Sequence, residues 1–282
     1  MNILEAIMSQ TFLQHALLAG VLAGIGCGVM GTYVVVKRIN FLAGGIAHSV
    51  LAGMGIAYFL GNSPVVGAII SALIAALIIG WIKLRWQEGE DTIIAAVWSV
   101  GMAIGIIFIA KTPGYSVDLM SYLFGNILMV SRDELYVMLV LDVILLAVVT
   151  IFYKQFLIVC FDEEFARLRG VNVELFYLVL LCLVALTVVL LIQVVGLILV
   201  IALLTLPAAI AVRYQTSLKN IMLLATVLGI FFSCAGIITS YEPDLPAGAT
   251  IILIAGISYI VASLFGGTSW GGVFKRRKPV KS

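Results

Sequence analysis

One charged stretch interrupts an otherwise apolar chain: Phe161-Asp162-Glu163-Glu164-Phe165-Ala166-Arg167-Leu168-Arg169-Gly170. The pattern predicts a short capped helix, because Asp162 can accept a hydrogen bond from the first turn and Gly170 can adopt the left-handed conformation that ends a helix. Two glutamates follow the cap at the positive end of the helix dipole, and two arginines occupy the negative end.

Three apolar side chains of this stretch share one helix face, because Phe161, Phe165 and Leu168 are spaced at i, i+4 and i+7. So short a segment cannot form a domain by itself. An apolar ridge that a short helix shows to water is typical of a surface that another protein binds.

The composition identifies the kind of protein. Of the 282 residues, 63% are hydrophobic and 11% are charged, and the mean hydropathy is +1.22. Soluble domains are about 45–50% apolar and about 25% charged. The chain is therefore predicted to be an all-α, polytopic membrane protein. Its net charge of +2, with no basic stripe before the C-terminal tail, does not favour a nucleic-acid partner.

Nine apolar runs are long enough to cross a bilayer. We expect one transmembrane domain over residues 1–274, with the 161–170 helix in the cytoplasm and a basic cytoplasmic tail at 275–282. The first run should stay in the mature protein, because no basic residue precedes it. Two connections are so short that a neighbouring run could be re-entrant. The predicted spans are 12–36, 42–60, 64–82, 92–110, 135–158, 173–191, 194–212, 220–240 and 247–266.

The basic residues predict the orientation in the cell membrane. With the N-terminus outside and the C-terminus in the cytoplasm, every Lys and Arg except Lys111 and Arg132 falls on the cytoplasmic side. The 161–170 helix would then face the cytoplasm.

Two sets of glycines repeat at four-residue spacing, Gly20/Gly24/Gly28 and Gly101/Gly105. Such rows let helix backbones approach closely. They predict tight packing within the bundle or, alternatively, a seam between two copies of the chain.

His48 and Asp142 are the candidate pathway residues, because ionisable groups inside membranes are costly and often mark transport routes. Imidazole suits divalent transition metals. His48 either lines such a path or is a hydrogen-bonded packing residue. Asp142 either lines the path or pairs with a polar partner in the bundle.

Enzymatic activity is not expected, and no cofactor is expected to be permanently bound. The cysteines, Cys27, Cys160, Cys182 and Cys234, have no metal-binding spacing and fit the role of small apolar residues. The chain has no GxxxxGK[ST] motif, so any ATP that drives transport would be hydrolysed on another chain.

Several motifs follow one another in the second half. After the 161–170 stretch come Gln193-Val194-Val195-Gly196-Leu197-Ile198-Leu199-Val200 and Asp244-Leu245-Pro246-Ala247-Gly248-Ala249-Thr250. Together, over roughly residues 12–266, they resemble the permease subunits of ABC importers for zinc, manganese or ferrous iron, the metal-transporting ABC-3 family. The resemblance implies a homodimeric membrane channel, two ATPase subunits on the cytoplasmic side and an extracytoplasmic metal-binding protein. It also implies that residues 161–170 are the coupling helix that docks on the ATPase.

One position departs from the family pattern. Family members carry an Asp four residues before the histidine that His48 matches, but this chain has Gly44 there. The expected carboxylate ligand is missing, and its place could be taken by another span, by water or by the second copy's histidine. The expected function is ATP-driven import of zinc or manganese, and iron is the next candidate. The alternatives are an ABC permease for a metal chelate or small organic ligand, and an ion-coupled secondary transporter working alone.

Overall fold

The computed structural model describes residues 7, 9–85, 90–112, 125 and 127–265. The predicted basic tail at 275–282 lies outside this part of the chain. Within it, nine helices are long and apolar enough to cross a membrane, which confirms the all-α, polytopic prediction. These helices are α2 (Thr11–Val36), α3 (Asn40–Phe59), α4 (Pro64–Arg85), α5 (Glu90–Lys111), α7 (Arg132–Ile151), α10 (Val173–Val195), α11 (Leu197–Tyr214), α12 (Leu218–Tyr241) and α13 (Ala247–Phe265).

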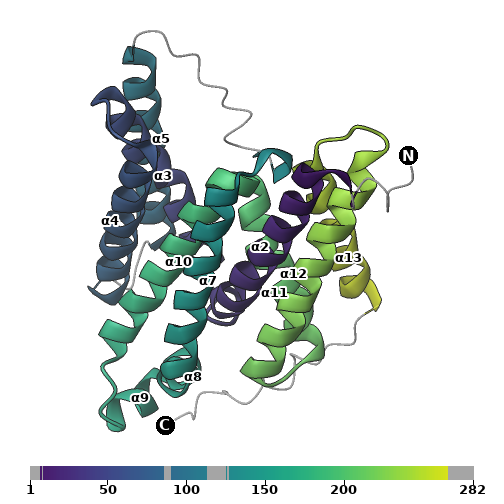
Figure 1. Ribbon diagram of the computed structural model, residues 1–282. Helices are drawn as coiled ribbons and strands as arrows, with labels where there is room; N and C mark the ends of the chain where they lie inside the picture. The colour runs from purple at the N-terminus through teal and green to yellow at the C-terminus, as the bar shows by residue number, and fades with distance from the viewer. Residues whose placement is uncertain (1–6, 8, 86–89, 113–124, 126, 266–282) are drawn as a thin grey trace.

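Three shorter helices lie between the long ones: η1 (Ile127–Met129), α8 (Tyr153–Phe161) and α9 (Glu163–Leu168). The long helices alternate in direction, so that α8 and α9 lie at the end of the bundle opposite η1 (Figure 1). The basic residues at helix ends gather at the α8–α9 end, whereas Lys111 and Arg132 lie at the other.

The predicted fifth span, 135–158, is wrong in its extent. Helix α7 ends at Ile151, and the chain turns at Phe152 before α8 begins. An aromatic cluster holds this turn, because Phe152 and Phe156 both lie against Phe176 of α10, with ring centroids 5.6 Å apart in each pair. The sequence is apolar up to the turn and again from Phe156 to Phe161, with Lys154 and Gln155 as the polar residues between, and the predicted span runs on through them.

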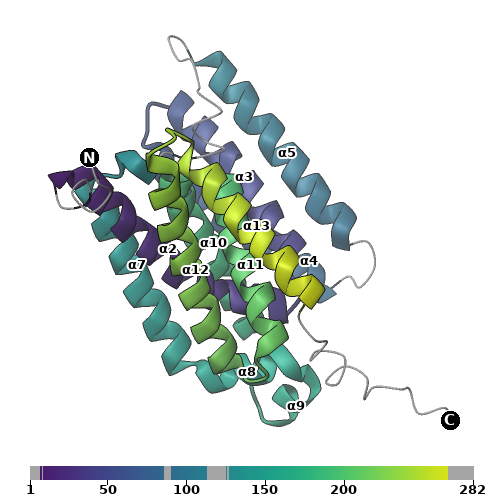
Figure 2. The same ribbon diagram turned by 90° about the vertical axis from the view of Figure 1, so that its right-hand side faces the viewer.

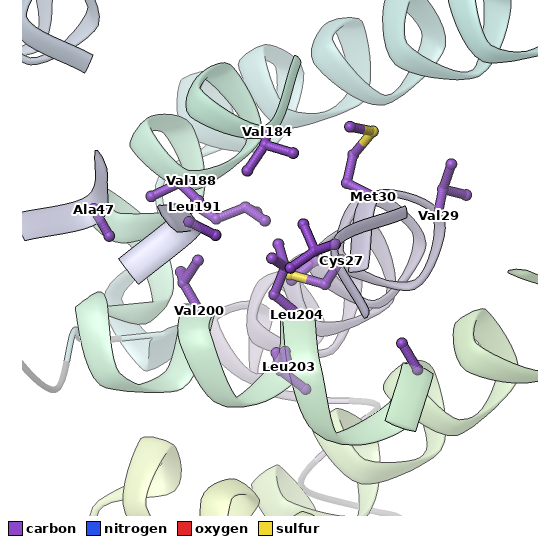
Figure 3. Packing of buried hydrophobic residues seen from close by; sticks show 14 of the residues in the cluster. Cys27, Val29, Met30, Ala47, Val184, Val188, Leu191, Val200, Leu203 and Leu204 are labelled. Carbon is purple, nitrogen blue, oxygen red and sulfur yellow. The ribbon is translucent and has the colours of Figure 1, made fainter. Parts of the chain in front are cut away.

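Helix α2 runs through the middle of the bundle, and most of it is buried. Its side chains meet those of α10 and α11 in a largely apolar core, shown in Figure 3 by Met30, Val184 and Leu204. The glycines that repeat every four residues in α2 allow α12 to pack closely against it. A Cβ on Gly24, for example, would lie 2.6 Å from the backbone nitrogen of Ile230. The glycines of α2 therefore pack helices within one chain, which was the first of the two roles predicted for them.

Helices α3, α4 and α5 form a group at one side of the bundle (Figures 1 and 2). Helix α3 packs closely on α4 and α5 but touches α2 only slightly, and α10 makes most of the contact between this group and the rest. The group is continuous with the core of the protein through a short turn at residues 37–39.

Both tight connections join helices that are long and apolar enough to cross a membrane, α3 to α4 and α10 to α11. Gly61 has φ +73° in the turn between α3 and α4, and Gly196 has φ +82° between α10 and α11. Glycine suits both positions because other residues pay a steric cost for positive φ.

Candidate transport pathway and coupling helix

Helix α9 is capped at both ends by the residues that the sequence predicted. The carboxylate of Asp162 accepts a hydrogen bond from the backbone nitrogen of Phe165 at 3.0 Å. At the other end Gly170 has φ +75°, and its N–H donates to the carbonyl of Arg167. The N–H of Val171 donates to the carbonyl of Ala166, which completes a Schellman motif. Local sequence thus determines this helix, although Phe161 is the last residue of α8 and not part of α9.

One face of α9 anchors it and the other is open. Ala166 is fully buried in a small apolar cluster with Val159 of α8 and Val173 of α10. Leu168, on the other side, is 86% exposed, and Phe161 and Phe165 are also exposed. Phe165 and Leu168 of α9 therefore form an exposed apolar ridge at the end of the bundle, outside the apolar spans, and Phe161 is exposed at the end of α8. Because Phe161 is not part of α9, the prediction that all three side chains share one helix face is wrong.

An ion pair joins this corner to the end of α2. The Nζ atom of Lys37 lies 2.5 Å from the Oε1 atom of Glu163 and donates a second hydrogen bond to the carbonyl of Val159 at 2.7 Å. The lysine side chain is only 11% exposed, whereas that of Glu163 is about half exposed. One ammonium group therefore contacts both the last turn of α8 and the first turn of α9.

His48 belongs to α3, and its ring stacks on that of Trp98 from α5. The ring centroids are 4.1 Å apart and the planes differ by 8°. The indole N–H of Trp98 donates to the sulfur of Met102 at 3.0 Å, which fixes the orientation of the indole. The His48 ring forms no hydrogen bond with the described residues, so it is a stacked histidine whose ring nitrogens remain open to a ligand.

The position one turn before His48 is open. A Cβ on Gly44 would meet no atom within 4 Å apart from the neighbouring backbone of its own helix, whereas a Cβ on Gly45 would lie 2.5 Å from Ile94. Residues at i and i+4 share a helix face. Space for a side chain therefore exists beside His48 at the position where the resemblance led us to expect a carboxylate.

Asp142 lies elsewhere, in the packed interface of α7 with α2 and α10. Its side chain is 4% exposed, and one carboxyl oxygen lies 2.8 Å from the position that a Cβ on Gly26 would take. The other oxygen, Oδ2, has no hydrogen-bond partner in the described part of the chain. Asp142 therefore has no polar partner there, and its surroundings are those of a packed core residue.

The structure does not bring the two candidate pathway residues together. His48 packs on α5 and Asp142 packs on α2, and no group of three or more His, Cys, Asp or Glu residues gathers within the described ranges. Three surface grooves of 370, 500 and 710 Å³ are lined by neither residue. At the candidate path, one chain alone thus offers only the imidazole of His48, with no complete metal site among the residues described.

Two further residues of interest, Trp98 and Lys37, were missed by the sequence analysis. Trp98 reads as an ordinary apolar residue, and Lys37 reads only as one of the charges that set the orientation. Each has its partner far away in the chain, 50 residues for Trp98 and 126 for Lys37. No local pattern signals either contact.

Known proteins share both the sequence and the fold. A profile of the ABC 3 transport family matches residues 9–266. The chain is 44% identical to a "probable metal transport system membrane protein" of Chlamydia pneumoniae, over 86% of this chain and 85% of that protein. It is 35% identical to the manganese transport system membrane protein MntC of Listeria monocytogenes serovar 1/2a, over 99% of both chains.

A solved structure shows the same arrangement of helices. PsaBC from Streptococcus pneumoniae, in complex with Fab, matches with a TM-score of 0.85 and 32% identity, over 95% of this chain and 96% of that chain. The expected permease fold is therefore confirmed, and with it the resemblance inferred from the motifs. This chain belongs to the ABC 3 transport family.

Proposed function

We propose that this chain is the membrane-spanning permease of an ATP-driven importer that moves manganese into the cytoplasm. The choice of manganese rests on the similarity to MntC over 99% of both chains. Zinc and ferrous iron are the next candidates. The bundle itself supports transport, because its long apolar helices carry His48 and Asp142 well away from their ends, and membrane proteins seldom carry ionisable residues there without a function.

The chain would be energised through α9. In this proposal its exposed ridge docks on an ATPase subunit, and ATP-driven closure of two such subunits pushes α9 of each permease. Capping at both ends suits this role, because a short helix held by Asp162 and Gly170 can transmit a push without unravelling. Ala166, packed on α8 and α10, passes the displacement to the membrane helices.

His48 is the residue we assign to the metal path. It is partly accessible, stacked on Trp98 and bounded on one side by the open space at Gly44. Two copies of the chain, related by a two-fold axis, would place two imidazoles along one path. A site with few ligands would hold the ion weakly, which favours passage over storage. Asp142 would then be a second, separate point in the bundle and not a co-ligand of His48.

The remaining partners follow from the same proposal. The chain would form a homodimer in the inner membrane, with the α8–α9 end in the cytoplasm, since that end carries the basic residues. An extracytoplasmic metal-binding protein would deliver the ion at the η1 end. ATP would be bound and hydrolysed only on the ATPase chains.

Reconstitution tests this function. The chain is placed in proteoliposomes with its ATPase and its binding protein, and uptake of radioactive manganese, zinc and iron is measured with and without ATP. We expect ATP-dependent uptake with manganese preferred, and no uptake by the chain alone. Robust uptake by the chain alone would replace the proposal with an ion-coupled transporter, and uptake of a metal chelate in place of free ions would change the substrate class.

A further inference from the structure

We propose that Lys37 is a positioning residue that links the coupling helix α9 to the turn from which the His48 helix begins. This inference rests on the proposed function, because it assigns Lys37 a part in transmitting movement from the ATPase to the metal path. The contacts that carry it are the ion pair with Glu163 and the hydrogen bond to the carbonyl of Val159.

Lys37 lies in the turn between α2 and α3, so its contact with α9 acts on that turn. Lys37 follows the last residue of α2, and α3 starts three residues later, at Asn40. His48 is in the third turn of α3. Any displacement of the Lys37 ammonium with α9 therefore acts at the junction between the central helix α2 and the helix that carries the candidate pathway residue.

The junction has the properties of a hinge. Arg38 has φ +60°, a left-handed conformation that is uncommon for a residue other than glycine. Beyond it, α3 packs mainly on α4 and α5 and only slightly on α2. Turning the α3–α5 group about residues 37–39 would separate little contact between α2 and α3, and the group would shift along α10, its main contact with the rest of the bundle. Hinges are commonly a few residues at the end of an element.

The groups that the Lys37 ammonium contacts on α8 and α9 suit a link between these helices and the turn after α2. The carbonyl of Val159 is one of the last in α8, where carbonyls have no partner within the helix, and Glu163 is the first residue of α9. A single ammonium group satisfies both and is largely shielded from water. Such a pair resists separation better than an exposed one, because breaking it leaves an uncompensated charge in a shielded place. Lys37 therefore moves with the α8–α9 corner.

The test uses the complete complex of permease, ATPase and binding protein in proteoliposomes. The variants are Lys37→Met, Glu163→Gln and the two together, with Lys37→Arg as the conservative change. Lys154→Met is the matched control, since Lys154 is an exposed lysine of α8 at the same end of the bundle. The measured quantity is the number of manganese ions imported per ATP hydrolysed.

We expect Lys37→Met and Glu163→Gln each to lower that ratio by about fivefold, at the weak end of typical coupling between sites. The double variant should be no worse than Lys37→Met alone, because both changes remove the same ion pair. Lys37→Arg and Lys154→Met should keep the wild-type ratio. A reduced rate of ATP hydrolysis at an unchanged ratio would mean that the pair only helps assembly, and would overturn the proposal.

Two results keep this inference separate from the proposed function. If the wild-type complex imports no metal, the proposed function fails before any variant is compared. If the wild type imports manganese and both single variants keep its ratio, the function stands and the link through Lys37 is wrong. Should Lys37→Met fail to assemble, Glu163→Gln decides alone, because Glu163 is half exposed and the change removes the ion pair while leaving Lys37 and its hydrogen bond to Val159 in place.

Discussion

The imidazole of His48 lies flat against the indole of Trp98, with ring centroids 4.1 Å apart and planes within 8°. The two rings come from α3 and α5, helices that pack closely because glycines line their contact: a Cβ on Gly55 would lie 2.5 Å from the carbonyl oxygen of Gly105. The stack holds the ring in one orientation without using either ring nitrogen. The metal path proposed above depends on a ring held in this way, with its nitrogens unused by other side chains of the described residues.

Replacing His48 with Ala should lower ATP-dependent manganese uptake by about tenfold or more, which corresponds to the loss of roughly 1.4 kcal/mol of interaction with the ion in transit. Uptake into proteoliposomes measures the effect. Trp98→Phe is the matched variant, because it keeps an aromatic ring beside the imidazole, and it should retain most of the uptake. Wild-type transport by His48→Ala would make the histidine a packing residue.

Gly44→Asp should strengthen manganese binding. A carboxylate there would lie on the same helix face as His48, and the structure leaves room for it. We expect affinity to rise about tenfold, for roughly 1.4 kcal/mol, as measured by titration calorimetry on the purified protein.

Gly45→Asp is the control for this change, since its side chain would meet Ile94 and should destabilise the protein without improving binding. The gain from Gly44→Asp should also disappear in a His48→Ala background. A gain that persists without the histidine would show that the two side chains do not share one ion.

Asp142→Asn tests whether the second intramembrane acid belongs to the path. Its Oδ2 atom has no partner among the described residues, and asparagine is nearly the same shape. If Asp142 is only packed, the variant should transport normally and unfold at the same or a higher temperature, because a neutral side chain costs less to bury. A large fall in uptake with unchanged stability would assign Asp142 to the pathway.

Much of the fold could be predicted because the deciding signals are local. The caps Asp162 and Gly170 determine α9 by hydrogen bonds to neighbouring backbone, and apolar length alone locates nine spans. The turn at Phe152 could not be found, since it is held by aromatic contacts with α10 that no local pattern shows. The contacts of His48 with Trp98 and of Lys37 with Glu163 join residues far apart in the chain. No local sequence pattern predicts either contact.

The close approach of α2 and α12 predicts opposite effects for two similar substitutions. Gly24→Ala should destabilise the protein by about 1–3 kcal/mol, since the new methyl group would press on the backbone of Ile230. Gly256→Ala in α13 meets no atom within 4 Å and should be neutral or slightly stabilising, because alanine favours a helix over glycine. Thermal unfolding in detergent compares the two, and equal midpoints would contradict the packing.

The docking role of α9 predicts that its charge pattern matters to a partner more than to the fold. Glu164→Arg combined with Arg167→Glu reverses that pattern while leaving Asp162, Gly170 and Ala166 in place. The variant should insert and unfold like the wild type, yet lose ATP-dependent uptake and co-purification with the ATPase.

Leu168→Asp should weaken ATPase binding for a different reason, because it places a charge in the middle of the ridge that the ATPase would cover. The side chain is 86% exposed, so the isolated permease should keep its stability. Tyr214→Asp is a matched control, an exposed residue at the end of α11 on the same side of the bundle. Wild-type ATPase affinity in Leu168→Asp, measured by titration in detergent, would mean that the ridge is not the docking surface, since no apolar contact of that size tolerates a buried, unpaired carboxylate.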